Sequence, residues 1–380
     1  MKYLYLILLL AVVTSCRKNK YAEITGTTVG FSSGTLVIRD QNDHIKFSGD
    51  IEDGKFDFHL TVDTIGYYSM RIINVSTLNA KKPGYDFYLE PGKYTIVAQP
   101  EFSRQYPQIT STSDIQTSLS QYYAIVNPLN ALISKDFGKY TTVLYDKNAT
   151  DDDKSKAHDE RNKIFAAESQ NGIKALQEYV AKYPQNNVEA HILSQLDYEA
   201  NADECYPIYQ KFTGEQKKSP EGAEEGEKLT GLMKLAPGNA APQIAGTTPD
   251  GKAFDPKSVQ GKITLVEFWT SDNELSKVNH NTLLYNSFSP LKTYTNFAVV
   301  SVSLDSVAKP WKDAIKEGGL TWTNISDLKG MNSPNMKNWQ ISKIPTYILI
   351  DENWKIIKRD INFGDLASAV QDYTDKSKKK

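Results

Sequence analysis

The chain has 380 residues and a nearly balanced charge, with 44 Lys and Arg against 46 Asp and Glu and a formal net charge of -2. This balance argues against a basic nucleic-acid-binding protein, and the length predicts more than one domain. The two cysteines, Cys16 and Cys205, are too few for a cysteine-rich zinc site or an iron–sulfur cluster within one chain. The five histidines form no metal-binding motif, so we expect neither a metal nor a cofactor.

The first sixteen residues have the pattern of an export signal. A positive start at Lys2 precedes an apolar run over residues 3–13, and small residues follow before Cys16. The run is shorter than the ~20 residues that span a bilayer and has the length of a signal peptide's apolar core. The segment Val13-Thr14-Ser15-Cys16 resembles the lipobox of bacterial lipoproteins, which implies that Cys16 carries lipid. The alternative is an ordinary cleaved signal with a chance cysteine.

We therefore expect a signal peptide over residues 1–15 and a lipid-anchored tether over residues 16–20. The membrane is then a partner through the lipid on Cys16, because two or more acyl chains anchor a protein stably. Arg17, rather than Asp, follows the cysteine. By the same resemblance this implies the outer membrane, with the protein facing the periplasm.

Residues 21–111 have the signals of short strands. Segments 35–39, 56–60, 67–72 and 94–98 are rich in β-branched and aromatic residues, and Gly-containing turns separate them. This spacing predicts a small antiparallel β-sandwich. The stretches 49–56 and 87–92 resemble an uncharacterised β-domain that precedes thioredoxin modules in bacterial lipoproteins. The aromatic residues of this region could serve a ligand or glycan site, or could simply pack; they are Tyr67, Tyr85, Phe87 and Tyr88.

Residues 112–234 have helical periodicity. Ser113 and Gln116 have the spacing of a capping box at a helix start. Apolar residues then recur at helical spacing from Ile164 to Val180. Cys205 follows Asp203 and Glu204, and acidic neighbours do not activate a thiol. We therefore expect Cys205 to be an inert, partly buried side chain.

Residues 235–375 alternate between strand and helix signals. Apolar runs at 264–269 and 297–304 predict buried strands, a hairpin is expected over 348–357, and a helix is expected over 365–373. This order predicts an α/β domain. A basic tail over residues 376–380 follows, and we interpret it as a solvated chain end.

The α/β domain resembles a known family. Ala241-Pro242, Gly261-Lys262, the run 266–271 and Ile344-Pro345-Thr346 follow the order of the TlpA and ResA type of thioredoxin-like disulfide reductases and of the related AhpC/TSA peroxiredoxin group. The resemblance implies a thioredoxin-like fold and a cis bond before Pro345. It also implies that Glu267 holds the position of a buried carboxylate that serves the thiols. Since no thiol follows it here, we give Glu267 a structural role over a functional one.

The cysteines of that family are missing from this chain. Counting from Trp269, the two redox positions are occupied by Asn273 and Ser276. Thiol–disulfide exchange requires a thiolate, which neither side chain can supply. We instead expect Ser271 and Glu274 to form a capping box that starts the helix.

These patterns favour a lipid-anchored envelope protein whose redox-silent thioredoxin-like domain binds an unknown envelope protein or peptide. The expected binding groove comprises Trp269, Asp272, Asn273, Ile344 and Pro345. In it, Trp269 would supply apolar area and the backbone of Ile344 would pair with an extended segment. The alternatives are a thiol–disulfide oxidoreductase, as the family implies, and ligand or glycan binding by the N-terminal β-domain.

Overall fold

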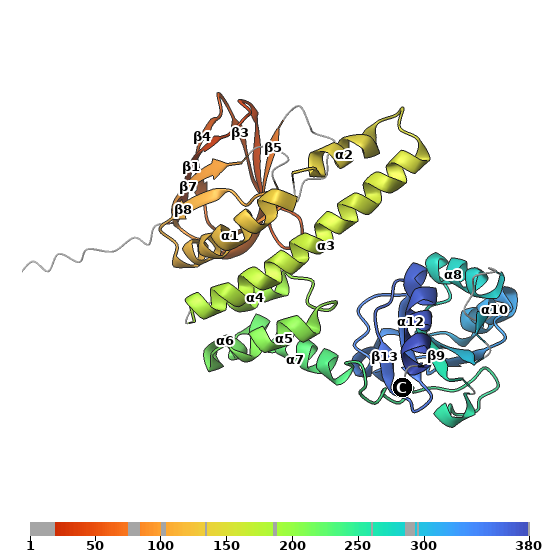
Figure 1. Cartoon of the computed structure of the whole chain (residues 1–380). Helices are drawn as coiled ribbons and strands as arrows, with labels where there is room; N and C mark the ends of the chain where they lie inside the picture. Colours follow the sequence, from red (N-terminus) through yellow and green to blue (C-terminus); the bar gives the residue numbers. More distant parts are fainter. Residues whose placement is uncertain are drawn as a thin grey trace, which may run out of the picture. The chain divides into compact units, whose positions relative to one another are not determined.

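The protein is described by a computed structural model over residues 20–74, 84–99, 104–133, 135–184, 188–259, 261–285, 293–294 and 296–378. The predicted signal peptide, Cys16 and the tether up to residue 19 lie outside the described residues. The chain divides into two compact units, Met1–Ile192 and Leu193–Lys380 (Figure 1). Among the helices of the described ranges, none is long and apolar enough to cross a bilayer.

Two four-stranded sheets form the first part of unit 1. One has the strand order β4-β1-β7-β8 and the other β3-β2-β5-β6. The strands are β1 (Tyr21–Thr28), β2 (Gly34–Arg39), β3 (Ile45–Ile51), β4 (Lys55–Thr61), β5 (Gly66–Asn74), β6 (Tyr85–Leu89), β7 (Gly92–Ala98) and β8 (Gln108–Ser111). The predicted β-sandwich is confirmed, although β1 and β7 pair in parallel and the other pairs are antiparallel.

The core of this sandwich comes from inward-facing residues of both sheets. Ile24, Leu36 and Ile96 are fully buried in one apolar cluster, together with Phe87. Tyr67 stacks on His191 with ring centroids 3.4 Å apart. Phe87 and Tyr67 therefore pack against other side chains, which supports the packing interpretation of the aromatic residues in this region.

The described part of unit 1 also contains α1 (Asp114–Ile133), α2 (Phe137–Tyr145), α3 (Asp151–Lys182) and the first part of α4 (Glu189–Ser194). The predicted capping box at the start of α1 is only half formed. Ser113 Oγ accepts the backbone N–H of Gln116, but Gln116 Oε1 accepts the N–H of Tyr88 instead of returning to Ser113. The Gln116 side chain therefore joins α1 to strand β6. The boundary between the two units falls inside α4, within the predicted helical region.

Unit 2 begins with α5 (Ala202–Gln210), α6 (Gly214–Lys218) and α7 (Pro220–Lys234). A five-stranded mixed sheet of order β11-β10-β9-β12-β13 follows. Its strands are β9 (Ile263–Trp269), β10 (Phe297–Ser303), β11 (Thr323–Ser326), β12 (Thr346–Asp351) and β13 (Ile356–Lys358). The helices around it are α8 (Glu274–Tyr285), α10 (Ala308–Gly318), α11 (Pro334–Asn338) and α12 (Leu366–Lys378). This is the predicted α/β arrangement.

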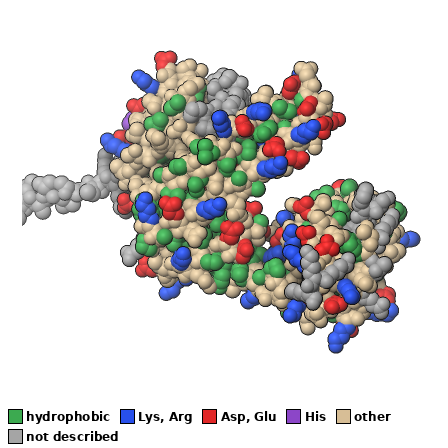
Figure 2. All heavy atoms as spheres, viewed as in Figure 1, with side chains coloured by type: hydrophobic (Ala, Val, Ile, Leu, Met, Phe, Trp, Pro, Cys, Tyr) green, Lys and Arg blue, Asp and Glu red, His purple; other side chains and the backbone are tan. Residues whose placement is uncertain are grey.

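The central strand β9 is buried along its whole length, as expected for a strand covered on both faces. Val266 and Phe268 pack on one face, in a cluster that includes Trp339. Leu265 packs on the other face, in a cluster with Leu283 of α8. The alternation of strand side chains therefore places Glu267 on the α8 side of the sheet. Figure 2 shows basic and acidic side chains interspersed over the visible surface of both units, consistent with the balanced charge.

Candidate functional site

The turn between β9 and α8 carries the two positions at which the resembled family has cysteines. Helix α8 begins at Glu274, and Asn273 caps it. Asn273 Oδ1 accepts the backbone N–H of Ser276 at 2.8 Å and the Ser276 hydroxyl at 3.1 Å. The predicted capping box from Ser271 to Glu274 is wrong, because the Ser271 hydroxyl donates to Asp305 Oδ1 at 2.7 Å. The former redox positions are therefore joined by hydrogen bonds that start the helix.

The Ile344-Pro345 turn lies against this cap. The Ile344–Pro345 peptide bond is cis, and the carbonyl of Ile344 accepts Asn273 Nδ2 at 3.4 Å. Asn273, Ile344 and Pro345 are thus brought together, as the predicted groove requires. Trp269 does not fit the expectation that it offers accessible apolar area, because it is 1% exposed and packs in a cluster with Trp311 and Leu320.

The described residues contain one cysteine, Cys205, which lies in α5 and not in the turn. It is fully buried. Burial, together with the charges of Glu204 and Asp203, raises the pKa of its thiol to about 12. At neutral pH the side chain is therefore a protonated thiol with little nucleophilic character.

Glu267 is the centre of a buried hydrogen-bond network on the α8 side of the sheet. Its neighbours in the sheet register are Ser301 on β10 and Tyr347 on β12. Ser301 Oγ donates to Glu267 Oε2 at 2.7 Å. His280 Nε2, from α8, lies 3.0 and 2.8 Å from the two carboxylate oxygens. A buried carboxyl group with these partners has its hydrogen bonds satisfied within the protein, which supports the structural role expected for Glu267.

The network extends on both sides of the carboxylate. Trp322 Nε1 donates to Ser301 Oγ at 2.8 Å, and Asn279 Nδ2 donates to the Tyr347 hydroxyl at 2.8 Å. Burial, with a smaller contribution from the charge of Glu267, raises the pKa of Tyr347. That hydroxyl therefore stays protonated over the physiological pH range.

Sequence analysis missed His280 because it is distant from every other histidine. A usable signal was present: Ser276 and His280 are four residues apart on α8, so they share the helix face that packs on the sheet. Both are buried. Ser301 and Tyr347 lie beside Glu267 because of the strand register of the sheet, which cannot be predicted from local sequence patterns.

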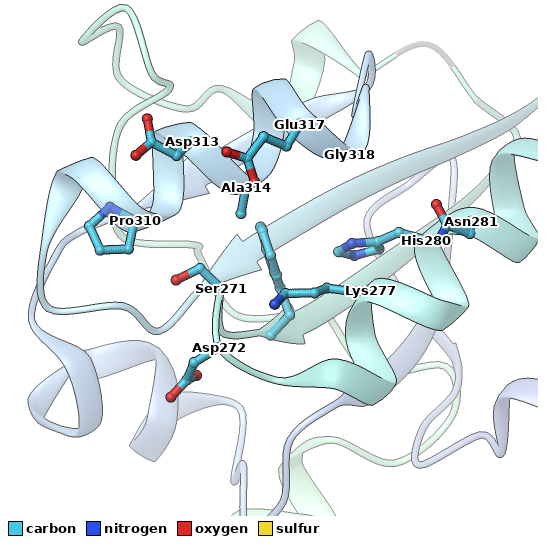
Figure 3. A pocket seen from close by; sticks show the side chains of 11 residues that line it. Ser271, Asp272, Lys277, His280, Asn281, Pro310, Asp313, Ala314, Glu317 and Gly318 are labelled. Atoms are coloured by element: carbon cyan, nitrogen blue, oxygen red, sulfur yellow. The ribbon is translucent and has the colours of Figure 1, made fainter.

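A pocket of about 540 Å³ opens between α8 and α10, beside the turn. Asp272, Lys277 and His280 line one side, and Asp313 and Glu317 line the other (Figure 3). Of the predicted groove residues, only Trp269 and Asp272 reach this pocket. Within the described ranges, no group of three or more His, Cys, Asp or Glu side chains is placed to hold a metal ion.

Two family models match separate parts of the chain. Residues 236–373 match the Redoxin family, and residues 22–117 match a domain of unknown function, DUF4369. The C-terminal domain is therefore thioredoxin-like, and a separate β-rich domain precedes it. No curated protein matched the chain.

Solved structures of bacterial proteins are similar to somewhat more than a third of the chain, with coverages of 36–37%. A thiol-disulfide oxidoreductase from Bacteroides fragilis is 27% identical, with a TM-score of 0.32, over 36% of this chain and 99% of that one. The thioredoxin domain of a thiol-disulfide oxidoreductase from Bacteroides vulgatus is 27% identical, with a TM-score of 0.33, over 37% and 98%. A thiol:disulfide interchange protein from Bacteroides sp. is 28% identical, with a TM-score of 0.32, over 37% and 91%.

Proposed function

We propose that this protein, whose C-terminal domain is thioredoxin-like, binds an extended protein segment and does not carry out thiol–disulfide exchange. The observation that carries the proposal is the bonding of Asn273 to Ser276 at the two redox positions. Exchange needs a thiolate that attacks a disulfide, and an amide and a hydroxyl cannot replace it. Cys205 is buried in another element, with a raised pKa, and offers no substitute.

Binding remains available to the fold without sulfur. The turn holds Ile344 and Pro345 beside the start of α8, where backbone groups can pair with an extended segment. The side-chain amide of Asn273 donates a long hydrogen bond of 3.4 Å to the carbonyl of Ile344. A bound segment would replace this bond at little cost, because a long neutral hydrogen bond contributes only about 1 kcal/mol or less.

A disulfide reductase assay on the full chain tests the redox part of the proposal. We expect the wild-type protein to reduce insulin no faster than buffer with the same reductant, because it has no thiol at the helix start. The Asn273→Cys/Ser276→Cys variant should form a disulfide and gain activity, since the start of a helix lowers a thiol pKa. The single Asn273→Cys variant is the matched control, because one thiol cannot close the intramolecular disulfide. Wild-type turnover that persists in Cys205→Ser would contradict the proposal.

The location of the protein is part of the same proposal. The pattern Val13-Thr14-Ser15-Cys16 supports a lipid anchor at Cys16 in the outer membrane, facing the periplasm. We expect the mature N-terminus to be Cys16 with a mass increase from acyl chains, and Cys16→Ser to release the protein from the membrane fraction. Intact mass measurement after membrane fractionation checks this, and an unmodified N-terminus at another residue would contradict it.

A further inference from the structure

We propose that the pocket between α8 and α10 binds the guanidinium group of an arginine side chain carried by a protein segment. This inference rests on the proposed binding function and names the partner chemistry. The pocket opens beside Asp272, the residue before Asn273, so it adjoins the turn proposed to hold an extended segment. A side chain of that segment could enter the pocket while its backbone follows the turn.

His280 gives the pocket an acceptor that the protein itself leaves unused. Its side chain is 4% exposed, and its Nε2 is directed at the carboxylate of Glu267. That carboxylate accepts hydrogen bonds, so Nε2 carries the hydrogen and, in the neutral imidazole, Nδ1 is an acceptor. Nδ1 makes no hydrogen bond to any described residue, and His280 lines the pocket (Figure 3). The Trp269 and His280 rings pack edge to face, with centroids 4.8 Å apart.

The charges of the lining favour a cation. Three acidic residues, Asp272, Asp313 and Glu317, oppose the single basic residue Lys277. Asp313 forms an ion pair with Lys309, and Lys277 forms one with Glu274 at 2.7 Å. The contact with Glu274 raises the pKa of Lys277, and the charges of Asp272 and Glu317 add to that effect. Asp272 and Glu317 have no hydrogen bond within the described part of the chain, so their carboxylate oxygens are available as acceptors for a ligand.

The arrangement of acceptors selects guanidinium over ammonium. Glu317 comes from α10 and His280 comes from α8, so these two acceptors lie on different walls of the pocket, whereas the carboxylate of Asp272 is directed away from both (Figure 3). Guanidinium carries five N–H donors spread over a plane and is weakly hydrated, whereas a lysine ammonium concentrates three donors at one point. A guanidinium group between Glu317 and His280 can therefore offer a separate N–H donor to each of them.

Calorimetry on the full chain in detergent at pH 8 tests the proposal. The probe is the blocked peptide acetyl-Gly-Arg-Gly-amide, compared with matching Lys and citrulline peptides and with methylguanidinium. We expect the Arg peptide to bind at least about tenfold more tightly than the citrulline peptide, because charge-assisted hydrogen bonds are lost with the charge. Asp272→Asn/Glu317→Gln should weaken Arg-peptide binding about tenfold or more. The matched variant Glu352→Gln/Asp372→Asn removes the same charge from exposed positions outside the pocket and should leave binding unchanged.

Nitrogen NMR of the wild-type imidazole gives a readout that needs no substitution of a buried residue. We expect His280 to be the Nε2–H tautomer, and its Nδ1 signal to move when the Arg peptide is added. A doubly protonated imidazole at pH 8, or an Nδ1 signal that does not move at saturation, would overturn the role of His280.

The remaining outcomes separate this proposal from the proposed function. Absence of Arg-peptide binding up to about 10 mM, a Kd at which binding free energy is already below about 3 kcal/mol, would overturn the pocket proposal alone. Equal affinity for methylguanidinium and the Arg peptide would overturn the assignment to a protein segment. Reductase turnover that survives Cys205→Ser would instead overturn the redox-silent function and leave the binding result standing.

Discussion

The start of α8 and the flank of the same helix differ in how far their polar groups are satisfied within the chain. At the start, Asn273 bonds to both Ser276 and Ile344, so each group has a partner. On the flank, Nδ1 of His280 has no hydrogen bond to any residue that the structure describes, and His280 lines the pocket. The two positions that lack cysteines are thus bonded to each other within the chain. An acceptor without a hydrogen bond on the same helix indicates instead where a ligand can bind.

The largest expected effect is on the free energy of unfolding, and it comes from the buried hydrogen-bond network around Glu267, which contacts His280 on α8. Glu267→Ala removes the carboxylate that Ser301 and His280 contact, and leaves both buried groups without their partner. We expect the free energy of unfolding to fall by about 2 kcal/mol or more, because leaving a buried donor without its acceptor costs about 1–3 kcal/mol. Chemical denaturation followed by fluorescence measures it. Glu352→Ala, at an exposed position, is the control, and a loss under about 1 kcal/mol for Glu267→Ala would contradict the role of the network.

A smaller effect on stability is expected at the helix start. Two substitutions there distinguish the contribution of the Asn273 cap from that of the Ser276 hydroxyl. Asn273→Ala removes the acceptor for the Ser276 backbone N–H and should cost about 1 kcal/mol of stability. Ser276→Ala keeps that backbone bond and should cost less. The two midpoints of denaturation, measured under the same conditions, decide the matter. A larger loss for Ser276→Ala would show that the hydroxyl, and not the cap, holds the turn.

The smallest effect at neutral pH is expected from Cys205, which takes part in neither region. Burial raises its pKa from 9.0 to about 12, so the folded thiol keeps a proton that the unfolded chain releases. Its contribution to stability is therefore complete below pH 9 and is lost as the pH rises toward 12. Cys205→Ala should show a shallower decline of stability over that range than the wild type. Rapid labelling of the folded wild type by a thiol reagent at pH 8 would contradict the buried assignment.

The sequence predicted the elements whose patterns are local. The strands around 264–269 and 297–304 and the position of the closing helix follow from runs of apolar residues, and the structure has them as β9, β10 and α12. Contacts that cross the sheet were not predictable in the same way. The row formed by Ser301, Glu267 and Tyr347 depends on strand register, which no local pattern encodes.

The helix start shows a second limit of local patterns. Ser271 and Glu274 have the spacing of a capping box, but the residue that caps the helix is Asn273, two positions after Ser271. Asp305, 34 residues away, bonds to the Ser271 hydroxyl instead. A capping motif competes with every acceptor that the fold brings near, so tertiary contacts decided which residue became the cap.

The burial of Trp269 beside His280 has an optical consequence. All five tryptophans of the chain lie in unit 2, whereas unit 1 has none. Excitation at the red edge of the indole band therefore reports on the thioredoxin-like unit alone, even in the full chain. Because an imidazole lies 4.8 Å from the Trp269 ring, an event that changes the charge of His280 would alter the quenching of that emission. Trp269 thus contributes to the tryptophan emission a component that comes from the wall of the pocket.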